Sequence, residues 1–142
     1  MNAEECKKLL IQEGCNPQSY SVGSSGSAED AFCLEKMGSK WLVFYTERGR
    51  HRNPIYSSES ESDASQYFYD FIMSKQHNHC VGFFIEERNA FNFQAELNKK
   101  KIVSTSDSIP YGGAHDPRYR VFVSGKAIFK VKELFKSLPI KD

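Results

Sequence analysis

The sequence lacks a strong excess of either charge. It has 19 Lys and Arg residues against 18 Asp and Glu residues, which leaves a formal net charge of +1. A dedicated nucleic-acid-binding domain needs many cations to neutralise phosphates, so this balance argues against that class. The chain is also not acidic enough overall to act as a mimic of DNA. We therefore expect its partner to be something other than nucleic acid.

Long apolar runs are missing as well. No stretch approaches the roughly 20 apolar residues that a membrane helix needs, so we expect no membrane association. The N-terminal segment MNAEECKKLL carries charges where a secretory signal needs an apolar core. The four cysteines form no CxxC pair, and without a leader we expect them to be reduced thiols. These absences predict a cytoplasmic protein.

The chain does have the length and the aromatic content for a packed core. It contains 142 residues, of which 13% are Phe, Tyr or Trp. A chain of this size can bury a hydrophobic core without metal or disulfide cross-links. We therefore predict a single domain that spans residues 1–142.

The first half of the sequence predicts a helix followed by strands. Asn2 begins the helix as its cap and Gly14 stands where it would end. Strands are expected at Ala31–Met37 and Trp41–Glu47, joined by a tight turn. A third strand is expected around His51–Ser57, at the sheet edge because Pro54 cannot donate a hydrogen bond to a neighbouring strand. Residues 21–30 are expected to form a flexible connector.

The second half predicts alternating helices and strands. Residues 60–75 have helical spacing, with Ala64, Phe68 and Ile72 on one face. We expect a short strand at Val81–Ile85 and a second long helix over residues 86–101. Residues 102–118 contain several Ser, Gly and Pro residues and are expected to form mostly a loop.

A hairpin is the expectation for the end of the chain. The segments RYRVFV and KAIFKV flank Ser124–Gly125, a two-residue turn signal. Val131, Leu134 and Leu138 then have the spacing of a closing helix. Together these elements predict an α+β fold, in which helices pack mainly on one face of an antiparallel or mixed β-sheet.

Two short constellations resemble chemical sites but are incomplete. His77, His79 and Cys80 lie close together without further zinc ligands at a usual spacing, so we expect no metal. In the segment YGGAHDPRYR, His115 is a possible general base, and Arg118 and Arg120 are possible phosphate ligands. No nucleophile motif or phosphate-binding loop accompanies them. A small enzyme acting on a phosphorylated substrate stays an alternative, but we expect no catalytic residue and no cofactor.

A second alternative is an RNA-binding module. Arg48, Arg50, His51 and Arg52 form a basic cluster, and Lys99–Lys101 form another. Both are also explained by solvent exposure, at a hairpin tip and at a helix C-terminus where cations are favoured. With a net charge near zero, we prefer the structural explanation.

An acidic segment directly follows the first basic cluster. Glu59, Glu61 and Asp63 come before or within the first turn of the expected helix, and Asp70 lies further along it. The helix dipole favours acidic residues at this position. Helix capping accounts for Glu61 and Asp63, but it does not fully account for Glu59. A basic protein partner is therefore a reasonable hypothesis for this surface.

Three segments of the chain are similar to small immunity proteins of bacterial polymorphic-toxin systems, including contact-dependent growth inhibition. They are WLVFYTERG, SESESDASQYFYDFI and RYRVFVSGKAIFKVKELF. The resemblance implies a non-enzymatic cytoplasmic protein that binds the C-terminal toxin domain of its cognate effector and blocks its active site. Toxins of this kind are often nucleases. The resemblance implies neither an oligomeric state nor a particular toxin chemistry.

The expected partner-binding residues combine acidic and exposed aromatic side chains. Aromatic residues often anchor protein interfaces. The residues we expect to contact the toxin domain are Tyr56, Glu59, Glu61, Asp63, Tyr67, Asp70, Tyr111 and His115.

Overall fold

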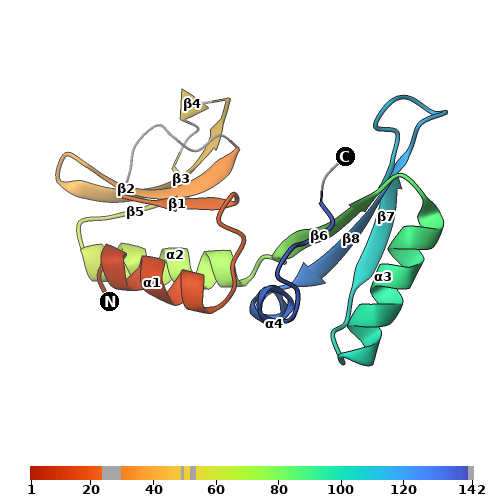
Figure 1. The fold of residues 1–142 in the computed structure, drawn as a ribbon. Coiled ribbons are helices and arrows are strands. Elements are labelled where there is room, and N and C mark those ends of the chain that lie inside the picture. Colours follow the sequence, from red (N-terminus) through yellow and green to blue (C-terminus); the bar gives the residue numbers. More distant parts are fainter. Residues whose placement is uncertain (24–29, 49, 52–53, 141–142) are drawn as a thin grey trace. The chain divides into compact units, whose positions relative to one another are not determined.

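The computed structural model describes residues 1–23, 30–48, 50–51 and 54–140 (Figure 1). The chain forms two compact units, Met1–Gln76 and His77–Asp142. The first, unit 1, contains α1 (Ala3–Gln12), β1 (Tyr20–Val22), β2 (Ala31–Met37), β3 (Lys40–Glu47), β4 (Arg50–His51), β5 (Tyr56–Ser58) and α2 (Glu61–Met73). The second, unit 2, contains β6 (Asn78–Phe84), α3 (Glu87–Lys99), β7 (Thr105–Ile109), β8 (Arg118–Ser124) and α4 (Ala127–Leu134).

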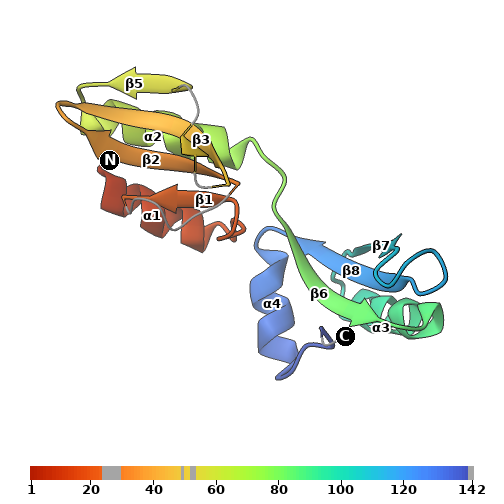
Figure 2. The ribbon, with the colours of Figure 1, turned by 90° about the horizontal axis from the view of Figure 1, so that it is seen from above.

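Unit 1 is a mixed sheet with both helices on one face. The strand order is β1-β2-β3-β4, and β5 also pairs directly with β3, along residues 41–43, whereas β4 pairs with residues 46–47. β1 is parallel to β2, whereas the other pairs are antiparallel. Figure 2 shows β5 running along β3. Leu10 of α1 and Phe68 of α2 pack with Leu34 and Val43 of the sheet, and all four are buried completely.

Unit 2 is a three-stranded antiparallel sheet in the order β6-β8-β7. The central strand turns Val121 and Val123 toward one hydrophobic cluster. Phe93 and Leu97 of α3 and Val131 of α4 belong to the same cluster, so both helices cover one face. Each unit therefore has its own sheet and its own core.

The α+β class is confirmed. The expectation of one sheet differs from the structure, because the strands divide between two sheets. Each unit has a separate hydrophobic core. That residues 1–142 behave as one domain stays a prediction.

Most predictions for unit 1 agree with its elements, but the strand expected around His51–Ser57 is replaced by the two short strands β4 and β5, and Pro54 lies in neither. Asn2 caps α1 by accepting a hydrogen bond from the backbone N–H of Glu5, and Gly14 has the positive φ of 73° expected beyond the helix. The hairpin turn at Gly38 also has a positive φ, of 64°. The strand β1 was missed because three residues are too few for a pattern. The rest of the predicted connector, residues 24–29, lies outside the described residues.

Two predictions in unit 2 are wrong. Residues 102–118 contain the strand β7, which hydrogen-bonds to β8 along five residue pairs. Its sequence, TSDSI, is exposed at four of five positions, so it shows no apolar alternation. The expected strand KAIFKV is instead the start of α4. Ile128 and Val131, three residues apart, are both buried against this unit's core, which favours a helix there.

Candidate functional site

The acidic residues at the start of α2 are partly used inside the fold. The Ser60 side chain caps the helix by accepting from the backbone N–H of Asp63 at 3.1 Å. The Glu61 carboxylate accepts a hydrogen bond from the backbone N–H of Ala3 at 2.8 Å, so it joins α2 to the first turn of α1. Asp63 accepts a hydrogen bond from the hydroxyl of Tyr56. Three of the predicted binding residues, Tyr56, Glu61 and Asp63, therefore have structural partners.

Tyr56 and Tyr67 form an aromatic stack beside these carboxylates. Their ring centroids are 4.1 Å apart with an angle of 4° between the planes. The hydrogen bond from Tyr56 lowers the pKa of the Asp63 carboxyl, and the same bond raises the pKa of the Tyr56 hydroxyl. Asp63 is therefore held as a carboxylate next to two half-buried aromatic rings. We call Tyr56, Glu59, Glu61, Asp63, Tyr67 and Asp70 the acidic tyrosine surface.

Glu59 and Asp70 complete this surface. Both are exposed. Asp70 accepts a hydrogen bond from the side-chain amide of Gln66 at 3.1 Å, one helical turn earlier. Beyond Tyr67, the stack continues to Phe71 at 6.2 Å, and the Lys75 ammonium lies 4.6 Å from the centre of the Phe71 ring. The Lys75 cation lies just beyond the C-terminal end of α2, so most of the negative charge of this surface lies before and in the first turn of the helix, at Glu59, Glu61 and Asp63.

Tyr111 and His115 lie in unit 2 and do not belong to the acidic tyrosine surface. Tyr111 is 51% exposed. Its ring meets Phe83 edge-on at 5.4 Å, and the Arg118 guanidinium lies 4.7 Å from its centre. His115 is exposed in the loop between β7 and β8. The structure therefore places the predicted partner-binding residues in two groups, one in each unit.

The arginines of the predicted phosphate site are engaged by carboxylates. Arg118 donates to Asp116 at 2.6 Å, and Arg120 donates to both carboxylate oxygens of Asp107, at 2.8 and 2.6 Å. Asp116 therefore pairs with Arg118 rather than orienting His115. An arginine that already holds a carboxylate has fewer donors for a phosphate, so this geometry weighs against the enzyme alternative.

The two basic clusters are only partly described. In the first, Arg48 is exposed with a positive φ of 52°, and the side chains of residues 50–52 lie outside the described part of the structure. In the second, Lys99–Lys101 stand at the C-terminal end of α3, as predicted. There the ammonium of Lys130 donates to the backbone carbonyl of Lys100 at 3.1 Å. The cluster therefore lies where the helix dipole favours cations, which supports its structural explanation.

The described residues contain no cluster of three or more His, Cys, Asp and Glu side chains able to hold a metal ion. His77 is buried, and His79, two residues further on, belongs to β6. All four cysteines are free thiols. Burial raises the pKa of the Cys6 thiol to about 11, so this thiol stays protonated and packs as an apolar group in the core of unit 1.

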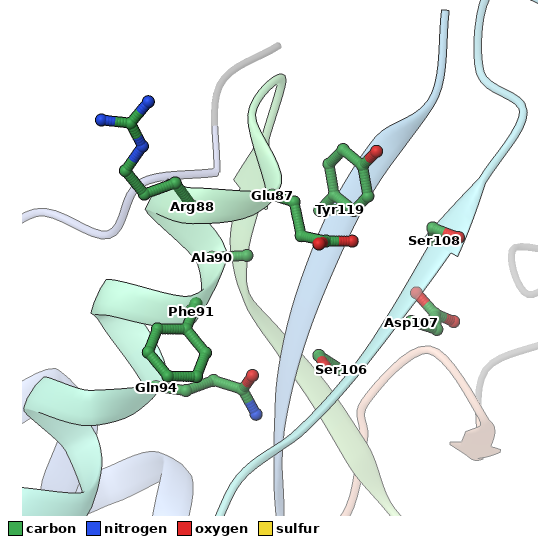
Figure 3. Close-up of a pocket in the computed structure, with 9 residues that line it drawn as sticks. All are labelled: Glu87, Arg88, Ala90, Phe91, Gln94, Ser106, Asp107, Ser108 and Tyr119. Atoms are coloured by element: carbon green, nitrogen blue, oxygen red, sulfur yellow. The ribbon is translucent and has the colours of Figure 1, made fainter.

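Sequence reasoning missed a pocket between α3 and β7. It has a volume of about 560 Å³ and lies entirely within unit 2 (Figure 3). Its lining residues are Glu87, Arg88, Ala90, Phe91, Gln94, Ser106, Asp107, Ser108 and Tyr119. In Figure 3 the Glu87 carboxylate points toward Tyr119 and Ser108, while the Arg88 side chain points away from them. In the sequence, Phe91 is only an apolar residue within a mostly polar helix, and this does not by itself indicate a pocket.

None of the described helices has the length and apolar character needed to cross a membrane. Comparisons with known proteins identify no relative: no family model, no curated protein and no solved structure matches the chain.

Proposed function

We propose that this chain is a cytoplasmic immunity protein, which binds the C-terminal toxin domain of a cognate effector through the acidic tyrosine surface and thereby blocks the toxin. The observation that supports it most is the stack of Tyr56 on Tyr67 at 4.1 Å beside the carboxylate of Asp63. Preorganised tyrosines lose little side-chain entropy on binding and commonly anchor protein interfaces.

Charge is the second support. Glu59 and Asp70 are exposed and flank the two structurally engaged carboxylates. Acidic groups gathered on one surface accelerate encounter with a basic partner and orient it. A nuclease domain with a basic substrate cleft would be such a partner. The resemblance of the segments WLVFYTERG and SESESDASQYFYDFI to immunity proteins points to the same function.

Co-purification tests this proposal directly. The chain is co-expressed with the C-terminal domain of the protein encoded beside its gene, and the complex is isolated through a tag on that domain. We expect the two to co-purify and the chain to protect cells that produce the domain. Absence of a toxin domain from the locus, or failure of the two proteins to associate, would remove the proposal.

Charge reversal then locates the interface. Glu59→Lys and Asp70→Lys are the cleanest variants, because neither side chain caps the helix, whereas Glu61 and Asp63 hold the fold together. We expect each variant to weaken association, and the double variant to weaken it more than either one. The loss should lie mainly in the association rate, because charges at the rim of an interface act mainly on that rate. Glu96→Lys, on α3 of unit 2, is the matched control. Equal effects of all three variants would exclude this surface.

A further inference from the structure

One edge of the sheet in unit 2 carries backbone groups that face outward. In an antiparallel pair, residues opposite each other alternately exchange backbone hydrogen bonds and point their backbone groups away from each other. The backbone N–H of Phe83 donates to the carbonyl of Pro139 at 2.7 Å, so Phe83 points away from β8. Its opposite residue on β8 is Arg120, which therefore points its own backbone groups toward β7.

The same alternation orients β7. Arg120 stands opposite Asp107, so these two residues exchange backbone hydrogen bonds across the β7–β8 pair. Their neighbours Ser106 and Ser108 then direct N–H and C=O groups to the outer side of β7. β7 is the last strand in the order β6-β8-β7. No backbone hydrogen bond to Ser106 or Ser108 from outside the sheet occurs in the part of the chain that the structure describes.

The pocket lies along this open edge. Ser106 and Ser108 line it from β7, and Glu87 and Phe91 line it from α3. Phe91 is 70% exposed, which is unusual for a large apolar side chain and provides an apolar wall. The Glu87 carboxylate points into the pocket (Figure 3). The other acid of the lining, Asp107, is already paired with Arg120. Arg88 also belongs to the lining, but its side chain points away from Tyr119 and Ser108 (Figure 3), so the unpaired charge that a visiting side chain would meet beside these residues is negative.

We infer that the outer edge of β7 binds an extended segment of a partner polypeptide as an added strand, with a lysine or arginine of that segment entering the pocket beside Glu87. Ser106 and Ser108 each present one N–H and one C=O group outward. These four groups can pair with the N–H and C=O groups of alternate residues in an added strand. The pocket supplies the selectivity, because alternate side chains of an added strand point to the same face. This site goes beyond the proposed function and does not depend on it.

A second copy of the chain fits this edge poorly. If two β7 strands paired antiparallel so that Ser106 of each faced Ser108 of the other, Asp107 would stand directly opposite Asp107. Like charges in that position are destabilising. A charged residue in the middle of an edge strand is also a common means of preventing self-association. The occupant we infer is therefore a different polypeptide that carries a positive charge.

Peptide titration followed by amide NMR tests this inference. The probe is a short synthetic peptide of alternating threonine and lysine, added to the full-length chain. We expect saturable shifts of the amide signals of Ser106 and Ser108. A peptide with glutamate in place of lysine should bind at least about tenfold more weakly, since it loses a charged contact worth roughly 1.4 kcal/mol or more. Equal binding of both peptides, or no shift at these two amides, would overturn the inference.

Variants of the chain separate the backbone from the side chains. Ser108→Pro removes the outward N–H but leaves the pairing with β8, because an edge strand tolerates proline where its N–H faces solvent. We expect it to weaken peptide binding about tenfold. Ser108→Ala removes the hydroxyl but keeps the N–H, so it should bind the peptide more tightly than Ser108→Pro, and equal losses in the two variants would contradict a backbone contact. Glu87→Gln should weaken binding of the lysine peptide and not of the glutamate peptide.

Two further measurements keep the test decisive. A lysine peptide with N-methylated backbone should not bind, and this result requires no change in the protein. Sedimentation velocity measures whether the chain pairs with itself through the β7 edge. We expect no self-association of the kind that Ser108→Pro would abolish. If such association occurs, the occupant is a second copy and the inference is wrong. If the peptide binds as expected but no toxin domain associates with the chain, the site on β7 is supported and the proposed function is wrong.

Discussion

The two units use different devices to hold similar α+β arrangements. In unit 1 both helices begin with a side-chain cap, since Asn2 and Ser60 accept hydrogen bonds from their first turns. In unit 2 neither Glu86 nor Lys126 makes such a bond at the start of α3 or α4. Unit 2 instead has an ion pair across its sheet, between Asp107 and Arg120. Local signals at the helix starts are therefore stronger in unit 1 than in unit 2.

The functional candidates differ in the same way. The acidic tyrosine surface comes from residues 56–70, which are close in sequence, so its composition is visible before folding. The pocket of unit 2 joins α3 to β7 and Tyr119, which are separated along the chain. A surface built from one segment can be predicted by composition, whereas a pocket built from several segments requires the fold.

The largest expected effect comes from emptying either core. Phe68→Ala should destabilise unit 1 by about 3–5 kcal/mol, and Leu97→Ala should destabilise unit 2 by about 2–5 kcal/mol, because both side chains are completely buried. The single tryptophan, Trp41, lies in β3 and reports on unit 1 alone.

Urea unfolding followed by Trp41 fluorescence and by circular dichroism shows whether the units are independent. Separate cores predict that Leu97→Ala shifts the dichroism transition and leaves the fluorescence transition in place. If both transitions shift together, the two units unfold as one domain, as the length of the chain predicts.

Glycine substitutions give the next largest effect and differ between the units. A Cβ on Gly82 of β6 would come within 2.7 Å of Phe84 and 3.2 Å of both Phe93 and Val121. Gly82→Ala should cost about 1–3 kcal/mol through overpacking. Gly38 has open space around it but a φ of +64°, so Gly38→Ala should cost about 1 kcal/mol through backbone strain. Thermal melts of both variants would check the order, and a larger loss for Gly38→Ala would contradict it.

The helix caps provide a third and smaller comparison. Ser60→Ala removes the cap of α2 and should destabilise unit 1 by about 1 kcal/mol. Glu86→Ser introduces a capping residue at the uncapped start of α3, and it should stabilise unit 2 by a similar amount. Urea midpoints measure both changes. A loss of stability in Glu86→Ser would show that the first turn of α3 has another, more important partner.

The smallest expected effects concern acid titration. The pKa of Asp63 is lowered first by its hydrogen bond with Tyr56, and the pKa of Asp107 is lowered first by Arg120. A carboxyl with a lowered pKa in the fold stabilises it above the ordinary pKa of about 3.9, and this contribution is lost as the pH falls through the lower, folded value.

Carboxyl NMR titrations separate the two groups. Tyr56→Phe should raise the pKa of Asp63 and leave that of Asp107 unchanged, because the two acids have different partners. Arg120→Gln should do the reverse. A change of both pKa values in either variant would show that the two groups are electrostatically coupled.

Much of the fold follows from patterns within short segments. The cap at Asn2, the hairpin of β2 and β3, and the apolar stripe of Ala64, Phe68 and Ile72 each lie within a few turns or strands. The residues that make up each cap, turn or apolar stripe are close to one another in sequence. The wrong predictions in unit 2 have the opposite origin. β7 has almost no apolar residue and is a strand because β8 supplies its hydrogen bonds.

The sequence by itself determined the α+β class, most helices and strands of unit 1, and the collection of acidic and aromatic residues between Tyr56 and Asp70. Only the tertiary structure decided that the strands form two sheets and that α4 replaces a predicted strand. It also decided which carboxylates are free, since Glu61 and Asp63 find partners that no local pattern reveals. The physical reason is that periodicity encodes which face of an element is buried, whereas the neighbour that buries it comes from elsewhere in the chain.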